Sequence, residues 1–404
     1  MSVLYILSMA IAFSFYFGGS QVVFWYKYAI ALVWSMGYIM TIVKRGWKIR
    51  RKDGEILAVY IFPLIMILGW TLLVWVIKPP MNLNNSNVTR MISNVIYLIL
   101  AVTSAVATSR FFGKKVIKYS VWAMFISIMT NLVYCIHLYG VGVFFQYLPK
   151  AIVSTDFKYG SVLYNFGSCI EVQDATLATG FYLLYFLLFD KEDERKEKIK
   201  YVILLLICSY LGFKRTQFIA LVITTILFLI IKKVKINLKQ VTFVMCVAFL
   251  IFSFVYAYVV KTDQFKLVVN TIGADVTGRQ NIYVNLSRYY ELSLFYIGKG
   301  FTFVDKTMYD LTGFAAHNTI IRLYAELGCI PFVIWMLWYL YYIPKYYINK
   351  TGKNTALLAI SCIMYLFMTY CIGNSMNFYC IQYSFILVPI SVLFEKNSGI
   401  QEKT

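Results

Sequence analysis

Long apolar runs recur along the whole chain, and they constrain its fold more than any other feature. A run of roughly 17–25 apolar residues can cross the hydrocarbon core as a helix, because only a helix satisfies its own backbone hydrogen bonds there. We identify about twelve candidate spans on this criterion, at residues 2–17, 23–43, 56–77, 92–109, 117–138, 172–189, 201–213, 216–231, 241–260, 319–343, 355–372 and 379–393. The sequence therefore predicts an all-α, polytopic integral membrane protein that forms a single membrane domain over residues 1–404.

The distribution of Lys and Arg predicts the orientation of these spans, because cytoplasmic loops carry the excess of positive charge. With the N-terminus inside, the inner segments hold 24 of the 38 Lys and Arg residues and the outer segments hold 12. Both termini are therefore predicted to be cytoplasmic. Residues 1–17 lack a basic start and a small-residue cleavage site, so we interpret them as a retained first span.

One alternative concerns residues 201–231, which could form a single helix with Lys214 and Arg215 at its centre. That helix would bury both charges at mid-bilayer, where each costs ~2.5–3.5 kcal/mol. It would also move the cluster Lys232–Lys239 to the outside, against the charge rule. A hairpin of two short spans is therefore favoured, with Lys214 and Arg215 at its outer tip, slightly below the membrane surface in a cavity.

The segment 261–317 is too long to be a simple connection, because loops in compact proteins typically have ~4–6 residues. It lies between the ninth and tenth predicted spans, so it is expected to form a large extracytoplasmic loop. Within it, Gln280–Phe295 has apolar residues at three- and four-residue spacing, which predicts an amphipathic helix. Residues 140–170 are rich in aromatic side chains and are expected to lie along the outer interface.

Composition argues against several classes of function. The net charge of +20 comes from Lys and Arg clusters between apolar runs, which a topology signal explains better than nucleic-acid binding does. Most of the eight cysteines fall inside predicted spans, so we interpret them as small apolar residues rather than as metal ligands or disulfides. There is no Cys-x-x-Cys motif, no paired histidine and no Asp-x-Asp cluster, and neither a metal nor another cofactor is expected.

His317 is one of only two histidines, and it lies where the long outer loop re-enters the membrane at the predicted span 319–343. Imidazole suits proton transfer near neutral pH, because its reference pKa is ~6.5. Asn318, Arg322 and Glu326 follow at four-residue steps, on one face of the same helix. We predict that His317 acts as a general base or an oriented hydrogen-bond partner and that the other three support it. A purely structural ion pair between Arg322 and Glu326 is equally compatible with the sequence.

Four basic residues are candidates for binding an anionic group. Lys214 and Arg215 oppose the charge rule at the tip of an outer hairpin; a lipid-linked pyrophosphate would explain them, and contact with outer headgroups is the alternative. Arg279 follows Gly278 at the predicted start of the loop helix, where backbone N–H groups and a guanidinium would form an anion site. Arg288 lies nine residues further on, about 2.5 turns away and hence on the opposite face of an ideal helix.

Two further patterns carry less information. Gly298 and Gly300 flank Lys299, and a tight turn with close backbone approach explains them better than an incomplete nucleotide-binding motif does. Glu171 and Asp174 open the sixth predicted span, where acidic residues stabilise a helix N-terminus. Binding of an acceptor sugar by this pair is the functional alternative.

Taken in order, the motifs form a pattern: Lys214-Arg215 in an outer hairpin, Gly278-Arg279 in a large late outer loop, Gly298-x-Gly300, and His317-Asn318 at the start of a stretch that continues to Glu326-x-Gly328. This pattern resembles the O-antigen ligase and polysaccharide repeat-unit polymerase family. The resemblance covers about residues 200–345, and the first half of the chain matches only as a series of spans. One departure is that Lys214 precedes the hairpin arginine and Thr216 follows it, where the family more usually has Ser or Thr as the neighbour.

The resemblance implies a metal-independent glycosyltransferase that acts on undecaprenyl-pyrophosphate-linked glycans at the outer face of the bacterial inner, or only, membrane. A polymerase of this family would move the growing glycan from its lipid pyrophosphate onto a fresh lipid-linked repeat unit, in capsule, O-antigen or exopolysaccharide synthesis. By position, Arg215 and Arg279 would hold the pyrophosphate, and His317 would orient or deprotonate the acceptor hydroxyl. The implied partners are the lipid-linked oligosaccharide, the bilayer, a flippase and a chain-length regulator, with no nucleic acid.

Three alternatives remain open from the sequence. The ligase branch of the same family has the same motifs. A lipid-linked oligosaccharide flippase would be expected to place charges near the bilayer midplane and to show internal symmetry, whereas the polar residues here gather at one predicted face. A membrane acyltransferase would place its histidine on the cytoplasmic side, whereas His317 is predicted to lie outside.

Overall fold

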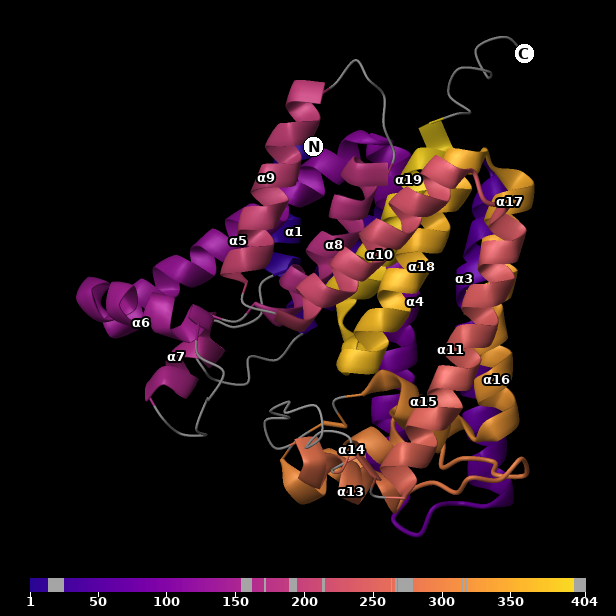
Figure 1. Ribbon diagram of the computed structural model, residues 1–404. Coiled ribbons are helices and arrows are strands. Elements are labelled where there is room, and N and C mark those ends of the chain that lie inside the picture. Colours follow the sequence, from indigo (N-terminus) through magenta and orange to yellow (C-terminus); the bar gives the residue numbers. More distant parts are fainter. Residues whose placement is uncertain are drawn as a thin grey trace.

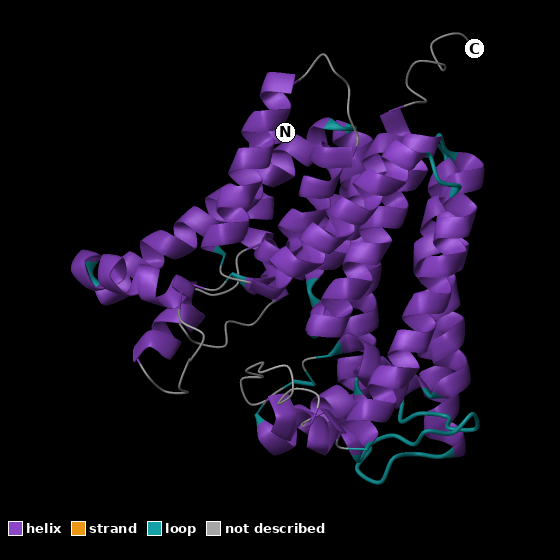
Figure 2. Ribbon diagram, in the orientation of Figure 1, coloured by secondary structure: helices purple, strands orange, loops and turns teal. Residues whose placement is uncertain are grey.

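The computed structural model describes residues 1–13, 25–153, 162–170, 172–188, 195–212, 215–262, 264–265, 267, 279–313, 315–316 and 318–395. These residues form helices and connecting loops, with no strand among them (Figure 2). The first half of the chain contains α1 (Ser2–Phe13), α2 (Trp25–Lys44), α3 (Arg51–Ile77), α4 (Asn85–Phe112), α5 (Lys115–Tyr139), α6 (Val141–Val153), α7 (Val162–Ile170) and α8 (Gln173–Leu188). The second half contains α9 (Arg195–Leu211), α10 (Arg215–Val234), α11 (Leu238–Lys261), α13 (Arg279–Ser287), α14 (Phe303–Thr312), α15 (Thr319–Leu327), α16 (Cys329–Leu337), α17 (Ile343–Lys350), α18 (Lys353–Ile372) and α19 (Tyr379–Glu395).

Seven of the described helices are long and apolar enough to cross a membrane, namely α2, α3, α4, α5, α10, α11 and α18. The helices α1, α8 and α19 are apolar but shorter. The described residues are thus all-α, as predicted, and their seven long apolar helices are consistent with a polytopic membrane protein, whereas the count of twelve spans stays a prediction. The outward faces of α10 and α11 carry exposed apolar side chains, including Ile226, Phe243 and Ile251. Such a surface is typical of contact with lipid rather than with water.

The predicted break between two helices within residues 201–231 is confirmed, because α9 ends at Leu211 and α10 begins at Arg215; that both helices cross the membrane stays a prediction. A single helix through this segment is therefore excluded. Gly212 follows α9 directly, and a Cβ at this position would lie 1.8 Å from Oγ1 of Thr176 on α8. The close approach to α8 explains why a glycine stands at the point where the chain turns.

The predicted continuous span 319–343 is wrong. The chain leaves the helix at Gly328 between α15 and α16, where φ is +80°, and a π-helical turn at Trp338–Tyr342 separates α16 from α17. Apolar periodicity could not reveal the first break, because its cause is a tertiary contact. A Cβ on Gly328 would lie 2.3 Å from the carbonyl oxygen of Tyr296, in the outer loop.

The predicted loop helix Gln280–Phe295 is too long at its C-terminal end. The observed helix α13 covers Arg279–Ser287, so Arg288 lies just beyond it instead of on its opposite face. Lys261 at the end of α11 explains this end point, because its Nζ donates hydrogen bonds to the carbonyl oxygens of Ser287 (2.8 Å) and Tyr290 (2.7 Å). A side chain from another helix thus binds carbonyl groups that would be needed to continue α13.

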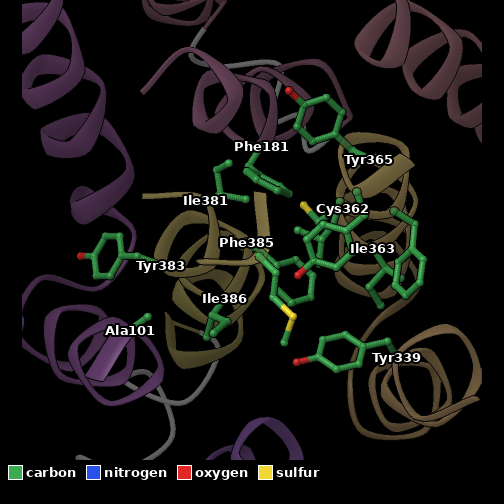
Figure 3. Close-up of a cluster of buried hydrophobic side chains, with 14 of the residues drawn as sticks. Ala101, Phe181, Tyr339, Cys362, Ile363, Tyr365, Ile381, Tyr383, Phe385 and Ile386 are labelled. Atoms are coloured by element: carbon green, nitrogen blue, oxygen red, sulfur yellow. The ribbon is translucent and has the colours of Figure 1, made fainter. Parts of the chain in front are cut away.

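The centre of the bundle is built around α18 and α19, which α4, α8 and the π-helical turn surround (Figure 3). Phe181 of α8 packs edge to face against Tyr365 of α18, with ring centroids 4.9 Å apart. Hydroxyl groups link helices inside this core: the Tyr383 hydroxyl lies 2.8 Å from that of Tyr5 and 2.7 Å from Oγ1 of Thr108. Such neutral hydrogen bonds hold helices together where the hydrophobic effect cannot.

Different helices and chain ends lie at the two ends of the bundle (Figure 1). The helices α13 and α14 pack at one end, which we call the outer end. The helix α1 begins at the opposite, inner end, where α19 ends and where α17 meets α18. This arrangement places the two termini of the bundle on the same side, as the charge distribution predicts. The side that faces the cytoplasm remains a prediction.

Candidate functional site

The outer loop is joined to the broken helix by backbone hydrogen bonds. Backbone N–H groups of Lys299 and Gly300 donate to the carbonyl oxygen of Glu326, at 3.1 and 2.8 Å, and Cys329 N–H donates to the carbonyl oxygen of Tyr296 at 2.8 Å. Gly298 has φ +86°, and a Cβ there would lie 2.4 Å from the carbonyl oxygen of Glu326. The predicted tight turn with close backbone approach is therefore confirmed for Gly298-x-Gly300.

Two tryptophan side chains of α3 also bind this turn. Trp70 Nε1 donates to the carbonyl oxygens of Ile297 (3.1 Å) and Leu327 (2.8 Å), and Trp75 Nε1 donates to that of Lys299 (2.8 Å). Because these groups lie far apart in the chain, sequence reasoning offered no signal for their contact. The outer loop, α3 and the α15–α16 junction consequently form one continuous unit.

Next to this turn lies a cluster of charged side chains, of which Asp305, Arg322 and Glu326 are buried and Arg90 is partly exposed. Asp305 of α14 accepts hydrogen bonds from Arg90 Nη2 of α4 (3.0 Å) and from Asn374 Nδ2 (2.9 Å), which follows α18. Arg322 of α15 lies with its Nη1 3.8 Å from Asp305 Oδ2 and with its Nε 3.8 Å from Glu326 Oε2. The backbone N–H of Asp305 donates to Glu326 Oε1 at 3.1 Å. Three helices, α4, α14 and α15, and the α18–α19 connection thus meet through these five residues.

The cluster balances its charges but leaves hydrogen-bonding capacity in its interior. Two guanidinium groups face two carboxylates, which offsets the large cost of burying each charge alone. Arg322 is fully buried, yet its only hydrogen bond to another side chain among the described residues is a long one of 3.5 Å, from Nη2 to Oδ1 of Asn377. Arg322 Nε and Nη1, Glu326 Oε2 and Asn374 Oδ1 make no hydrogen bond within the described protein. Since buried polar atoms almost always have partners, this cluster can still bind a further polar group.

Of the two sequence interpretations of Arg322 and Glu326, the structure favours neither exclusively. The two side chains do form an ion pair four residues apart on α15, at 3.8 Å. The pair is not isolated, because Asp305 lies equally close to Arg322. Asp305 and Arg90 were missed by sequence reasoning, since Asp305 lies in the middle of the outer loop and Arg90 sits before the apolar part of its helix.

Buried tyrosines add contacts between the outer loop and the bundle. The Tyr296 hydroxyl lies 2.6 Å from the carbonyl oxygen of Ala325, and the Tyr290 hydroxyl donates to that of Ala257 at 2.7 Å. Burial raises the pKa of both phenols well above the ordinary value, and Tyr324 nearby raises each further. Both hydroxyls therefore remain neutral hydrogen-bond donors.

A cavity of about 350 Å³ opens at the outer end, between the α3–α4 connection and α14. Its volume falls within the range of ~300–1,000 Å³ that is typical of small-ligand sites. Arg288 and Lys299 line it, together with Asn82, Asn84 and Asp310. Asp310 pairs with Lys306, so Arg288 and Lys299 supply the excess positive charge of the wall. Lys299 was not predicted as a binding residue; its position between two conformationally special glycines was the available signal.

Asn318 has a structural role in the described part of the site. Its Oδ1 accepts a hydrogen bond from Ile321 N–H (2.9 Å), which caps α15, and its Nδ2 donates to the carbonyl oxygen of Cys371 (3.0 Å). These bonds fix the start of α15 against the end of α18. His317 lies outside the described residues, between Ala316 and Asn318, which are both fully buried.

The remaining predicted site residues fall at or beyond the edges of the described structure. The helices α10 and α13 begin at Arg215 and Arg279, as expected, but the side chains of both lie outside the described part. Lys214 and Glu171 lie outside it entirely, and Asp174 is described only as part of the first turn of α8. In Figure 1 the start of α10 lies near mid-height of the bundle, whereas α13 lies at the outer end.

Among the described residues, no group of three or more His, Cys, Asp or Glu side chains could hold a metal ion. Comparison with models of known protein families finds no match, and comparison with curated proteins finds no significant relative.

Proposed function

We propose that this protein is an oligosaccharide repeat-unit polymerase that transfers a growing glycan from undecaprenyl pyrophosphate to a lipid-linked repeat unit at the outer face of the membrane. The motif order from Lys214 to Gly328 motivates the proposal. One structural observation supports it most: Lys299 of the Gly298-x-Gly300 turn and Arg288 line the same cavity, and this turn is hydrogen-bonded to α15, the helix that directly follows His317 and Asn318.

The chemistry of the reaction suits these residue types. The acceptor hydroxyl oxygen would attack the anomeric carbon of the donor glycan, and the bond from that carbon to the phosphate oxygen would break. The lipid pyrophosphate would leave with the bonding electrons, and cationic side chains would stabilise its negative charge. Following the resemblance, we assign this role to Arg215 and Arg279, with Lys214 in support, and we add Arg288 and Lys299 from the cavity.

His317 would accept the proton of the acceptor hydroxyl or orient that hydroxyl for attack. One modest base suffices, because a pyrophosphate is already a good leaving group. Asn318 and the cluster of Arg322, Asp305 and Glu326 would position the first turn of α15, and with it His317, through the contacts described above. We further propose that Glu171 and Asp174 contact the acceptor sugar.

The test is a His317→Ala substitution in a strain deleted for the gene, with His137→Ala as the matched control. His137 is the only other histidine, and it is exposed in the last turn of α5. Surface glycan is read as a size ladder, and lipid-linked repeat units are identified by mass. The proposal expects that His317→Ala removes the ladder and leaves single repeat units on lipid at the outer face, while protein level and the His137→Ala ladder stay normal.

Other outcomes would redirect the assignment. Long chains that persist on lipid but do not reach a final acceptor would indicate the ligase branch of the same family. Repeat units trapped at the inner face would contradict both enzymes and indicate a flippase. A normal ladder with His317→Ala would remove this histidine from the mechanism.

A further inference from the structure

The helices α6 and α7 form a small unit that packs beside the main bundle, against the end of α5 (Figure 1). Among the described residues its core consists of five buried side chains, Cys135, Phe144, Ala151, Phe166 and Ile170, and it is separate from the main core. The unit lies directly before α8 in the chain. Contacts that hold α7 against α5 therefore also determine the position of the start of α8.

Two side chains of α5, one helical turn apart, contact the last residues of α7. Asn131 Nδ2 donates hydrogen bonds to the carbonyl oxygens of Cys169 (2.9 Å) and Ile170 (3.0 Å). Cys135 lies four residues further along the same face of α5, and its Sγ is 2.8 Å from Sγ of Cys169. The amide of Asn131 thus holds the backbone of Cys169 while Cys135 meets its side chain.

This cysteine pair differs from the other cysteines in its surroundings. The remaining six, Cys208, Cys246, Cys329, Cys362, Cys371 and Cys380, pack within the main core of the bundle. Cys169 is the only cysteine outside the predicted spans, in the segment 140–170 that the charge rule places at the outer face. Disulfides form and persist in extracytoplasmic compartments.

We propose that Cys135 and Cys169 form a disulfide bond in the mature protein, which locks α7 onto α5. A disulfide has its sulfurs ~2.05 Å apart, so the two atoms need to approach by only about 0.8 Å. This assignment rests on the predicted topology and is independent of the proposed glycan chemistry. It also departs from the sequence interpretation of all the cysteines as small apolar residues, because spacing alone could not show which two would meet.

The bond would form by exchange with an oxidised dithiol protein or a small-molecule disulfide of the outer compartment. Cys169 is only partly buried, whereas Cys135 is fully buried, so Cys169 is the thiol that the oxidant can reach. Its thiolate would attack the oxidant's disulfide and release one thiolate from it. Cys135 would then attack the mixed disulfide and release the second, so that the protein loses two protons and two electrons and the oxidant gains them.

The experiment counts reactive thiols in the full-length protein in native membranes. Cells are quenched with acid, and the protein is denatured in detergent and labelled with a polyethylene-glycol maleimide, with and without prior reduction. The chain has eight cysteines, so the proposal expects ~6 mass shifts without reduction and ~8 after it. Cys135→Ser and Cys169→Ser should each give ~7 under both conditions.

The control variant Cys246→Ser removes a cysteine of the main core, and it should give ~5 shifts without reduction and ~7 after it. Digestion should yield a reducible peptide pair that contains Cys135 and Cys169. Full labelling of wild-type protein without reduction would overturn the proposal, and so would protection that survives in Cys169→Ser. Because the readout is labelling and not glycan synthesis, its failure would leave the proposed function unaffected.

Discussion

Two arginines at opposite ends of the bundle, the partly buried Arg110 and the fully buried Arg322, show how differently one residue type can be used. At the inner end, Arg110 of α4 pairs with Asp53 of α3: its Nε donates to Asp53 Oδ1 at 2.8 Å, and its Nη2 also contacts that oxygen. The Tyr38 hydroxyl donates to the second carboxylate oxygen at 2.5 Å, and the guanidinium lies over the Phe394 ring. The ion pair is therefore saturated with partners.

At the outer end, Arg322 lies between the carboxylates of Asp305 and Glu326 but forms a close hydrogen bond with neither of them. Its contacts with Asp305 and Glu326 are both 3.8 Å long, and two of its nitrogens have no hydrogen-bond acceptor among the described residues. The same helix, α4, reaches both sites, because Arg90 and Arg110 are twenty residues apart, or ~30 Å along the axis. The Arg110–Asp53 pair, whose hydrogen-bonding groups have partners, can only hold helices together. The outer cluster also has donors and acceptors without a partner among the described residues, which can bind a further polar group.

The largest expected difference is between Arg322→Met and Arg110→Met. The first should lower glycan transfer by at least ~10²-fold, because the cluster that positions the first turn of α15 and His317 loses its central guanidinium. The second should lower the free energy of unfolding by ~3–5 kcal/mol, because it leaves Asp53 buried and unpaired, while folded protein keeps its transfer rate. Transfer is measured with lipid-linked repeat units in detergent, and unfolding is followed by denaturant titration.

Arg322→Lys separates stability from activity in this comparison. Lysine keeps the positive charge but lacks the planar fork of donors, so transfer should fall while the protein folds. If Arg322→Lys transfers glycan as fast as the wild type, the outer cluster only stabilises the fold, as the Arg110–Asp53 pair does.

A smaller effect is expected for Gly298→Ala, measured against Gly313→Ala. Both glycines have positive φ, at +86° and +72°, but only Gly298 has backbone atoms within reach of a Cβ. Gly313→Ala should therefore cost ~1–2 kcal/mol from backbone strain alone. Gly298→Ala should cost clearly more and should also reduce transfer, because it pushes the outer loop away from Glu326. Equal losses of stability would mean that the loop can move without consequence.

Helix caps at the two ends provide the next comparison. Asn318 caps α15 and also binds the carbonyl oxygen of Cys371, whereas Asn237 caps α11 at the inner end and accepts one bond, from Lys239 N–H at 3.0 Å. Asn237→Ala should cost ~0.5–1 kcal/mol, and Asn318→Ala ~1–2 kcal/mol. Only Asn318→Ala should slow transfer, because it loosens the helix start beside His317. A slower rate in both variants would indicate a general loss of folded protein.

The smallest expected effect distinguishes two lysines of the outer loop. Lys299→Gln should raise the KM for the lipid-linked donor by ~3–10-fold at low salt, because one cation of the cavity wall is lost. Lys306→Gln should leave KM unchanged, since Lys306 is paired with Asp310. Neither change should alter unfolding measurably. A KM that rises equally in both variants would point to the general field of the loop rather than to the cavity.

Local patterns in the sequence were sufficient to predict the helices, because apolar run length and charge position act residue by residue. Eleven of the twelve predicted spans coincide with a described helix, and the break before Arg215 follows from the cost of burying two charges. The start of α13 at Arg279 and the turn at Gly298-x-Gly300 were likewise readable from neighbouring residues.

Contacts between distant segments decided the rest. The break at Gly328 depends on the carbonyl group of Tyr296, and the end of α13 depends on Lys261. Asp305 meets Arg322, and Cys135 meets Cys169, only because separate helices pack together. Periodicity within one segment determines which residues become helical, but it carries no information about the neighbour that each face will meet. For this protein the sequence alone therefore predicted a helical membrane chain and its orientation, and the tertiary structure decided which of its polar residues lie together.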